Sequence, residues 1–182
     1  MILLLDANVL VDFQRADLLG ELVKASATVE MAVVEQVLDE VTLVREEDSS
    51  DTVGRKRKAQ ALLTQARLQT LEILPRTPEA ALLQTLLTPV NTVRRKDQGE
   101  AASVAVATGD PRLVFVTGDK TAVLWSLNEL FGSGERVMRI PVFVRTLHAK
   151  DALGAVTVKR IAERAASHGV VPSWWDDWLA NL

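Results

Sequence analysis

Acidic side chains stand at four separated points of the chain, each near an apolar segment. Asp6 directly follows the apolar run MILLL, and Asp119 follows the run LVFV after a Thr-Gly pair. Glu40 lies in the segment after a second apolar run, and Glu100 is near the start of an alanine-rich segment. Carboxylates are the oxygen donors that Mg²⁺ or Mn²⁺ prefer. The chain has no cysteine, so the four acids point to a divalent-metal site rather than a thiolate site.

Such a site would suit the hydrolysis of a phosphodiester. The phosphate is anionic, so attack by hydroxide needs positive charge at the reacting centre. A bound metal ion supplies that charge, lowers the pKa of its water and stabilises the leaving oxygen.

Each acid also has an interpretation that needs no metal. Asp6 could cap the helix that follows it, and Glu40 could be a solvated helix charge. Asp97 and Glu100 have the spacing of a capping box, so Asp97 is a candidate both for a helix cap and for a metal ligand. Asp119 is a candidate both for a turn residue and for a ligand.

Helix-like and strand-like segments alternate along the chain, which predicts an α/β fold with a mainly parallel sheet. Apolar runs predict strands at residues 2–5, 28–34, 71–74, 113–116 and 137–144. Periodicity and capping patterns predict helices at residues 9–24, 37–44, 97–108, 121–131 and 156–167. Three more helices have only one predicted boundary: one ends near residue 68, one begins at residue 77, and one lies after residue 173. Ligands of open parallel sheets lie at the carboxyl ends of the strands, where we expect the acids to gather.

The composition fits one folded domain. The 182 residues are 48% hydrophobic and 25% charged, which is close to ordinary globular usage and predicts an ordered chain. The start of the sequence has no basic leader and no apolar run is long enough to span a membrane, so we expect a soluble, cytoplasmic protein. The formal net charge of -3 means that nucleic-acid contacts would have to come from local basic patches.

Two basic clusters could form such patches. Arg94, Arg95 and Lys96 directly precede the acidic segment, which would place them at the rim of the proposed site. A second cluster, residues 55–58, belongs to a segment that we predict to be an exposed loop over residues 45–58. Phosphate contacts would be natural for both clusters, although most runs of charge are simply solvated.

Four motifs in this order, LLLDANVLVDF, VLDEV, DQGEAASVAVA and VFVTGD, resemble the acidic motifs of PIN-domain ribonucleases over about residues 1–144. The segment LGAVTVKRIAERAASHGVV is similar to the end of the subgroup whose third motif reads GEAEA, which includes VapC-like toxins. The resemblance implies a three-layer α/β/α sandwich over residues 1–150, with residues 151–182 as a helical extension packed on the same domain. A homodimer would also be in keeping with it.

The resemblance also implies an activity, the Mg²⁺- or Mn²⁺-dependent hydrolysis of RNA phosphodiester bonds. By motif, Asp6, Glu40, Glu100 and Asp119 would be the catalytic metal ligands, and Asn8 would orient the site. Many members are toxins that a small antitoxin protein silences, so RNA is the implied substrate and an antitoxin an implied partner.

The sequence departs from the subgroup at two places. Ser103 stands where the subgroup has a second glutamate, and Lys120 follows the fourth acid where some relatives have another acid. Asp97 could replace the missing ligand. These departures keep open an alternative, a catalytically degenerate PIN fold that binds RNA or protein.

The tail segment SWWDDWL is rich in tryptophan. Ser173 is the predicted N-cap of a final helix, and Trp174 and Trp178 would share one face of it at the i, i+4 spacing. The interpretation that we favour is that these rings anchor the tail helix to the domain or to a partner subunit. Stacking on nucleic-acid bases is the alternative.

Overall fold

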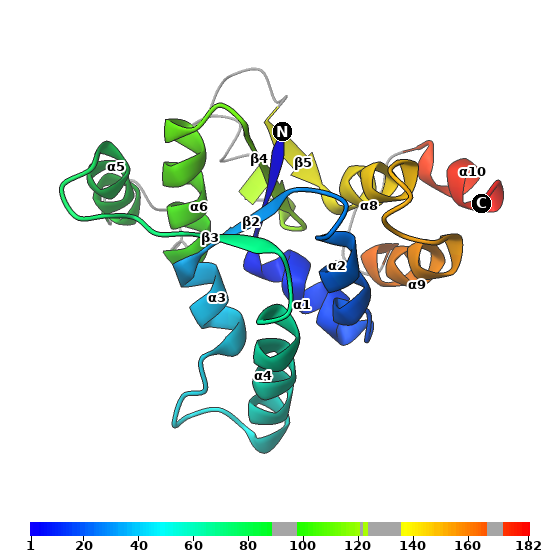
Figure 1. The fold of residues 1–182 in the computed structure, drawn as a ribbon, viewed down its shortest axis with the longest axis horizontal. Coiled ribbons are helices and arrows are strands. Elements are labelled where there is room, and N and C mark those ends of the chain that lie inside the picture. Colours follow the sequence, from blue (N-terminus) through cyan, green and yellow to red (C-terminus); the bar gives the residue numbers. More distant parts are fainter. Residues whose placement is uncertain (89–97, 121, 124–135, 167–172) are drawn as a thin grey trace.

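The sheet has five strands and every neighbouring pair is parallel (Figure 1). The computed structural model describes residues 1–88, 98–120, 122–123, 136–166 and 173–182. The strand order is β3-β2-β1-β4-β5. The strands are β1 (Ile2–Leu5), β2 (Met31–Val34), β3 (Leu68–Leu71), β4 (Leu113–Thr117) and β5 (Val137–Arg139). The predicted α/β class with a mainly parallel sheet is confirmed.

Helices flank this sheet, with α5 and α6 to one side of the strands and α8, α9 and α10 to the other (Figure 1). The described helices are α1 (Ala7–Arg15), α2 (Leu19–Ala25), α3 (Glu35–Thr42), α4 (Ser50–Leu63), α5 (Pro78–Leu87), α6 (Gln98–Gly109), α8 (Ile140–Ala149), α9 (Ala155–Ala166) and α10 (Trp175–Ala180). None of the helices in the described part of the chain is long and apolar enough to cross a membrane.

The three central strands are buried along their whole length, which explains their unbroken apolar sequences. The predicted strand at residues 2–5 is confirmed, and the one at 113–116 extends by one residue to Thr117. Leu5 pairs with Val116 across β1 and β4. The carboxyl ends of the two strands are therefore level, and the residues that follow them are neighbours.

Several predicted boundaries are wrong. The predicted helix 9–24 is two helices, separated at Asp17, whose φ of 57° lies in the left-handed region. The third strand is β3, three residues earlier than the predicted 71–74, and α4 ends at Leu63 rather than near 68. Residues 140–144 were predicted as strand but begin α8, with Pro141 in the first turn, where proline is well tolerated. Most of the predicted helix 121–131 lies outside the described residues.

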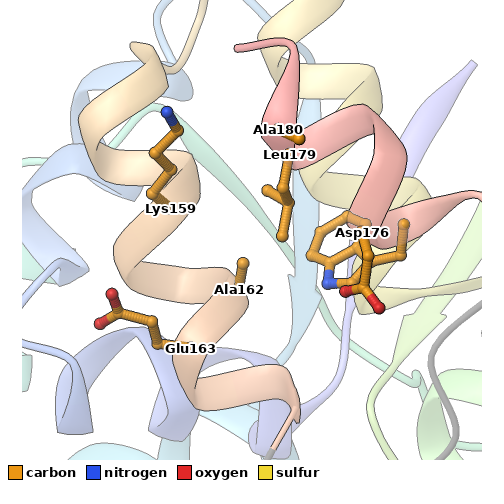
Figure 2. A pocket seen from close by; sticks show the side chains of 7 residues that line it. Lys159, Ala162, Glu163, Asp176, Leu179 and Ala180 are labelled. Atoms are coloured by element: carbon orange, nitrogen blue, oxygen red, sulfur yellow. The ribbon is translucent and has the colours of Figure 1, made fainter.

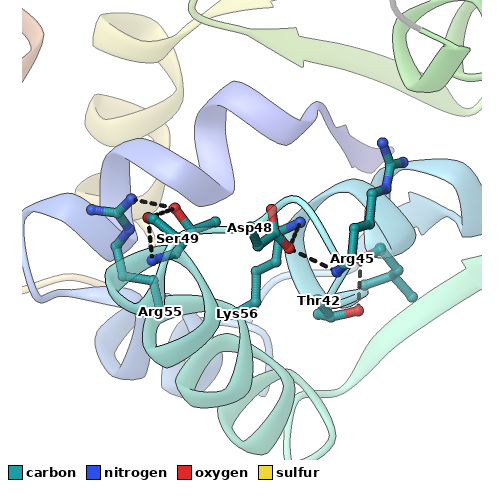
Figure 3. A network of polar contacts seen from close by, with 8 residues as sticks. Thr42, Arg45, Asp48, Ser49, Arg55 and Lys56 are labelled. Carbon is teal, nitrogen blue, oxygen red and sulfur yellow. Dashed lines mark hydrogen bonds and ion pairs between the residues drawn. The ribbon is translucent and has the colours of Figure 1, made fainter.

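The segment that joins α3 to α4, residues 43–49, is an exposed loop, as predicted, and it takes part in a polar network with the start of α4 (Figure 3). Lys56 forms an ion pair of 2.8 Å with Asp48, which also accepts a hydrogen bond of 2.8 Å from the backbone N–H of Arg45. Ser49 caps α4 by accepting from the backbone N–H of Thr52 at 3.3 Å. Residues 55–58 thus lie inside a helix, and the loop predicted for them is wrong.

The tail is attached to the rest of the molecule by its tryptophans. Trp175 is 1% exposed and belongs to the same hydrophobic core as the strands. Arg145 of α8 stacks over the ring of Trp174 at 4.7 Å, and the ring of Trp178 is 6.0 Å from that of His148. These contacts favour the anchoring interpretation. The predicted N-cap is wrong, because Trp174 and not Ser173 occupies that position.

Candidate functional site

Asp6 and Thr117 meet at the carboxyl edge of the sheet, directly after β1 and at the end of β4. The hydroxyl of Thr117 donates a hydrogen bond of 2.8 Å to Oδ2 of Asp6. Oδ1 of the same carboxylate accepts from the backbone N–H of Ala7 at 2.8 Å, so Asp6 is also the N-cap of α1. The capping interpretation and a functional role are therefore compatible in one residue.

Asn8 links the ends of the two strands. Its Nδ2 donates to Oδ2 of Asp6 at 2.5 Å and to the hydroxyl of Thr117 at 3.0 Å. Its Oδ1 accepts from the backbone N–H of Gly118 at 2.6 Å. A Cβ at Gly118 would lie 3.2 Å from Oδ1 of Asn8 and 2.8 Å from Cδ1 of Ile140, so this close approach favours glycine. Asn8 therefore fixes the orientation of the Asp6 carboxylate.

The Asp6 carboxylate is buried, and no positively charged side chain of the described residues is among the groups that shift its pKa. Only 4% of the residue is exposed. The pKa of Asp6 is raised overall from 3.8 to about 6, because the effects of burial and of the Asp119 charge, which raise it, outweigh the hydrogen bonds from Thr117, Ala7 and Asn8, which lower it. A carboxylate in this setting is held in its charged form at a free-energy cost that a nearby cation would offset.

Asp119 is positioned by the turn after β4. Its backbone N–H donates to the hydroxyl of Thr117 at 3.2 Å, and its Oδ1 accepts from the backbone N–H of Ala122 at 3.4 Å. The residue is exposed, and its charge acts on Asp6. The turn interpretation of Asp119 thus holds, and the turn also places its carboxylate beside Asp6.

A cleft of about 380 Å³ opens in front of these residues. It is lined by Asn8, Val11, Asp12, Arg15, Gly118, Asp119 and Lys120. Asp6 lies behind this lining. Sequence analysis missed Asp12 and Arg15. Their spacing from Asn8, four and seven residues on one face of a helix, could have revealed them once Asn8 was assigned to the site.

The other two predicted acids belong to α3 and α6. Oε1 of Glu40 accepts from the backbone N–H of Gly99 at 3.3 Å, at the start of α6, and Glu100 is the next residue there. A Cβ at Gly99 would lie 3.1 Å from each oxygen of the Glu40 carboxylate. The structure thus brings Glu40 to the segment that carries Glu100.

The acids form two groups, Asp6 with Asp119 and Glu40 with the start of α6. Among the described residues, no group of three or more histidine, aspartate or glutamate side chains is close enough to hold a metal ion. The four-acid site therefore stays a prediction. Asp97, the candidate cap or ligand, lies outside the described residues, as do Arg94, Arg95 and Lys96.

Ser103 fills the position of the missing glutamate. It is fully buried in α6, and its hydroxyl has no hydrogen-bond partner within the described part of the chain. A glutamate of the kind seen in the GEAEA subgroup would be a larger, charged group in this enclosed space. The local packing is thus built for a small side chain.

Two of the four cations in the second basic cluster form ion pairs. Besides the Lys56–Asp48 pair, Lys58 contacts Asp17 at 2.5 Å. Arg55 donates to the hydroxyl of Thr52 at 3.2 Å. Because these cations diverge around α4 and mostly have partners, they support the solvated-charge interpretation better than a nucleic-acid patch.

A second hollow, of about 400 Å³, lies between α9 and α10 (Figure 2). Lys159 and Glu163 stand on one wall, and Asp176 and Leu179 on the other. The indole N–H of Trp175, which also lines the hollow, has no hydrogen-bond partner among the described residues. None of its lining residues belongs to the cleft beside Asp119.

No protein-family model matches the chain, and neither a curated protein nor a solved structure is similar to it at a significant level.

Proposed function

We propose that this protein is a metal-dependent endoribonuclease with a PIN-like fold, a three-layer α/β/α sandwich. The observation that carries the proposal is the buried Asp6 carboxylate, which Asn8 and Thr117 orient and on which the charge of Asp119 acts. This pair lies at the carboxyl edge of a parallel sheet, where α/β folds place their ligands. Asp119 of this pair also lines a cleft of about 380 Å³, together with Asn8 and Gly118.

The residues of this edge fit Mg²⁺ or Mn²⁺. The available donors are carboxylate, amide and hydroxyl oxygens, and Mg²⁺ commonly uses only one or two carboxylates together with water and substrate phosphate. Oδ1 of Asp6 accepts one hydrogen bond, so it keeps a lone pair for a cation. Asp6 and Asp119 would hold the ion. Glu40 and Glu100, which the motif resemblance implies as further ligands, form a separate group among the described residues. A bound ion would activate water and stabilise the leaving oxygen.

The chain's own residues would contribute rigidity. Asn8 and Thr117 hold Oδ2 of Asp6 from two sides, so the carboxylate cannot rotate away from Asp119. Gly118 lets the turn after β4 approach Asn8 closely enough for a 2.6 Å hydrogen bond. Such preorganisation reduces the rearrangement needed when substrate binds.

The same cleft is where a small antitoxin protein would block the site if the chain belongs to a toxin–antitoxin module. The predicted cytoplasmic location and homodimer belong to this hypothesis as well. A short reading frame beside the gene that encodes a basic, amphipathic protein would support it.

A degenerate fold that only binds RNA or protein is the second candidate. Two observations favour it. No three acidic or histidine side chains of the described residues come together, and the position of the second glutamate is a buried serine. Under this hypothesis the cleft binds a strand without cutting it.

A cleavage assay separates the two candidates. Labelled single-stranded RNA is incubated with wild type and with Asp6→Asn, in Mg²⁺, in Mn²⁺ and in chelator. We expect cleavage by wild type only with metal, and its loss in Asp6→Asn. Equal cleavage by both proteins would refute the assignment of Asp6, whereas binding without cleavage in either metal would favour the degenerate fold.

A further inference from the structure

Two cations line the cleft beside Asp119 and form no ion pair with any other described residue. Arg15 ends α1, and Lys120 follows the turn after β4. Both are exposed, and neither side chain has a hydrogen bond or ion pair in the part of the chain that the structure describes. Four other cations of the described residues form ion pairs with acids, namely Lys24, Lys56, Lys58 and Arg112, whereas exposed cations such as Lys150 do not.

Arg15 lies along the cleft, away from the Asp6 carboxylate. Asn8 and Arg15 are seven residues apart on one face of α1, with Val11 and Asp12 between them in the lining. At 1.5 Å per residue, the Cα of Arg15 is about 10 Å further along the helix than that of Asn8. Any group that Arg15 binds is therefore displaced from the place where Asn8, Gly118 and Asp119 meet.

The charge of the lining favours an extended anion. It contains two acids, Asp12 and Asp119, and two bases, Arg15 and Lys120. The charges balance, so a divalent cation beside Asp119 would make the cleft positive. Val11 adds an apolar surface between the acidic end and Arg15. A ligand with anionic groups at intervals and apolar parts between them matches this arrangement.

We propose that Arg15 and Lys120 bind a backbone phosphate of a single-stranded nucleic acid, one that neighbours the phosphate to be cleaved. The strand would run along α1 from Asn8 towards Arg15. This inference rests on the proposed function for the identity of the strand. It makes the two cations positioning residues, because they act on the strand and not on the bond that breaks.

The length of the substrate tests this subsite. The dinucleotide UpU has a single phosphodiester, so the phosphate to be cleaved has no neighbour. A 12-nucleotide oligo(U) has a neighbouring phosphate beside each phosphate that can be cleaved. The variants are Arg15→Gln and Lys120→Gln. Lys150→Gln is the matched control, because Lys150 is an exposed cation at the far end of α8 from the carboxyl edge of the sheet.

We expect each cleft variant to raise the KM for the 12-mer about fivefold at 0.1 M salt with kcat unchanged, and to leave UpU cleavage as in wild type. Each lost phosphate contact should also lower the slope of log K against log salt by about 0.7, measured by fluorescence anisotropy of labelled 12-mer. Lys150→Gln should match wild type in both measurements.

Three results are decisive. Salt slopes equal to that of wild type in both cleft variants would overturn the subsite, whether or not RNA is cut. An equal loss on UpU and on the 12-mer would also overturn it, because the cations would then serve the scissile phosphate itself. Binding of the 12-mer that depends on Arg15 and Lys120 but is never followed by cleavage would support the subsite and refute the proposed hydrolysis.

Discussion

Replacing Asp6 with asparagine should change how the stability of the metal-free protein depends on pH. Burial raises the pKa of Asp6 to about 6 in the folded chain, against 3.8 as its ordinary value. Below pH 3.8 the group is protonated in both states. Between the two values the unfolded chain ionises first, so the folded state loses stability as the pH rises. Above pH 6 the loss is complete, and the difference between the pKa values makes it about 3 kcal/mol.

The substitution also has an effect that does not depend on pH. An asparagine side chain has one oxygen and one amide nitrogen, so it cannot accept from Ala7 on one side and from Asn8 and Thr117 on the other. One donor loses its partner, at a cost of about 1–3 kcal/mol. Asp6→Asn should therefore be less stable than wild type at pH 4. At pH 7.5 the removed charge offsets most or all of this cost.

Urea denaturation in chelator, followed by tryptophan fluorescence, measures both proteins from pH 4 to pH 7.5. The free energy of unfolding of Asp6→Asn minus that of wild type should rise by about 2.4 kcal/mol across this range, because part of the total loss of about 3 kcal/mol has already occurred at pH 4. Asp110→Asn is the control, because the pKa of Asp110 is lowered to about 2, mainly by its hydrogen bonds from Arg112. The stability that the ionised Asp110 carboxylate adds to the folded state is therefore present above pH 3.8 and is lost only in stronger acid. Its difference from wild type should thus be flat above about pH 5.

A difference for Asp6→Asn that stays flat, or that falls as the pH rises, would refute the account of a buried uncompensated carboxylate. Metal gives a second check on the same proteins. Mg²⁺ at a hundredfold excess over its dissociation constant should stabilise wild type by about 2.7 kcal/mol, and Asp6→Asn by clearly less. An equal gain in both proteins would place any bound metal away from Asp6.

Three further substitutions, with Gly54→Ala as a control for the first, test the packing of the protein by urea denaturation. Gly99→Ala should destabilise the protein by about 1–2 kcal/mol, because the added Cβ would lie 3.1 Å from the carboxylate oxygens of Glu40, which reach the start of α6. It should also lower any metal-dependent cleavage. Gly54→Ala should instead stabilise the protein by about 0.5–1 kcal/mol, because a Cβ at this helical position meets no atom within 4 Å. A loss of stability in both glycine variants would contradict the explanation by close contact. Thr117→Val should destabilise by about 1–2 kcal/mol, more at pH 7.5 than at pH 4, since the lost hydroxyl stabilises the ionised carboxylate; a pH-independent loss would refute this role. Trp175→Ala should destabilise by about 3–5 kcal/mol, and a loss below 1 kcal/mol would mean that the tail is not anchored by this ring.

Segments with one dominant local cause were predictable from the sequence. β1 and β4 are short apolar runs buried on both faces, and Thr77 with Pro78 begins a helix as its capping hydroxyl and first-turn proline predict. The run from Val137 to Val144 was misjudged because a short apolar stretch fits a strand and a buried helix equally well. Proline at position 141 lacks the N–H that a strand would need for pairing, and this could have decided for the helix.

The site was predictable in part, for a similar reason. The position of Asp6 after an apolar run identified it, because a carboxylate at the end of a buried strand needs partners. Its partner Thr117 was missed, since its role depends on the pairing of two strands that are more than a hundred residues apart. The cleft cations were also missed. Arg15 and Lys120 line the same cleft only because the fold places α1 next to the turn after β4.

The strand order locates the site without help from the motifs. From β1 the chain adds β2 and β3 on one side, and β4 and β5 lie on the other side of β1. The chain segments that leave the carboxyl ends of β1 and β4 therefore run to opposite sides of the sheet. This leaves a crevice between the two ends, and α/β sheets bind their ligands at such a crevice. Asn8 after β1 and Gly118 to Lys120 after β4 line the cleft at this place. The motif resemblance selects the same residues from the sequence alone. If the cleavage assay is negative, the resemblance fails as a guide to chemistry, but the crevice and its oriented carboxylate still predict a cation-dependent binding site.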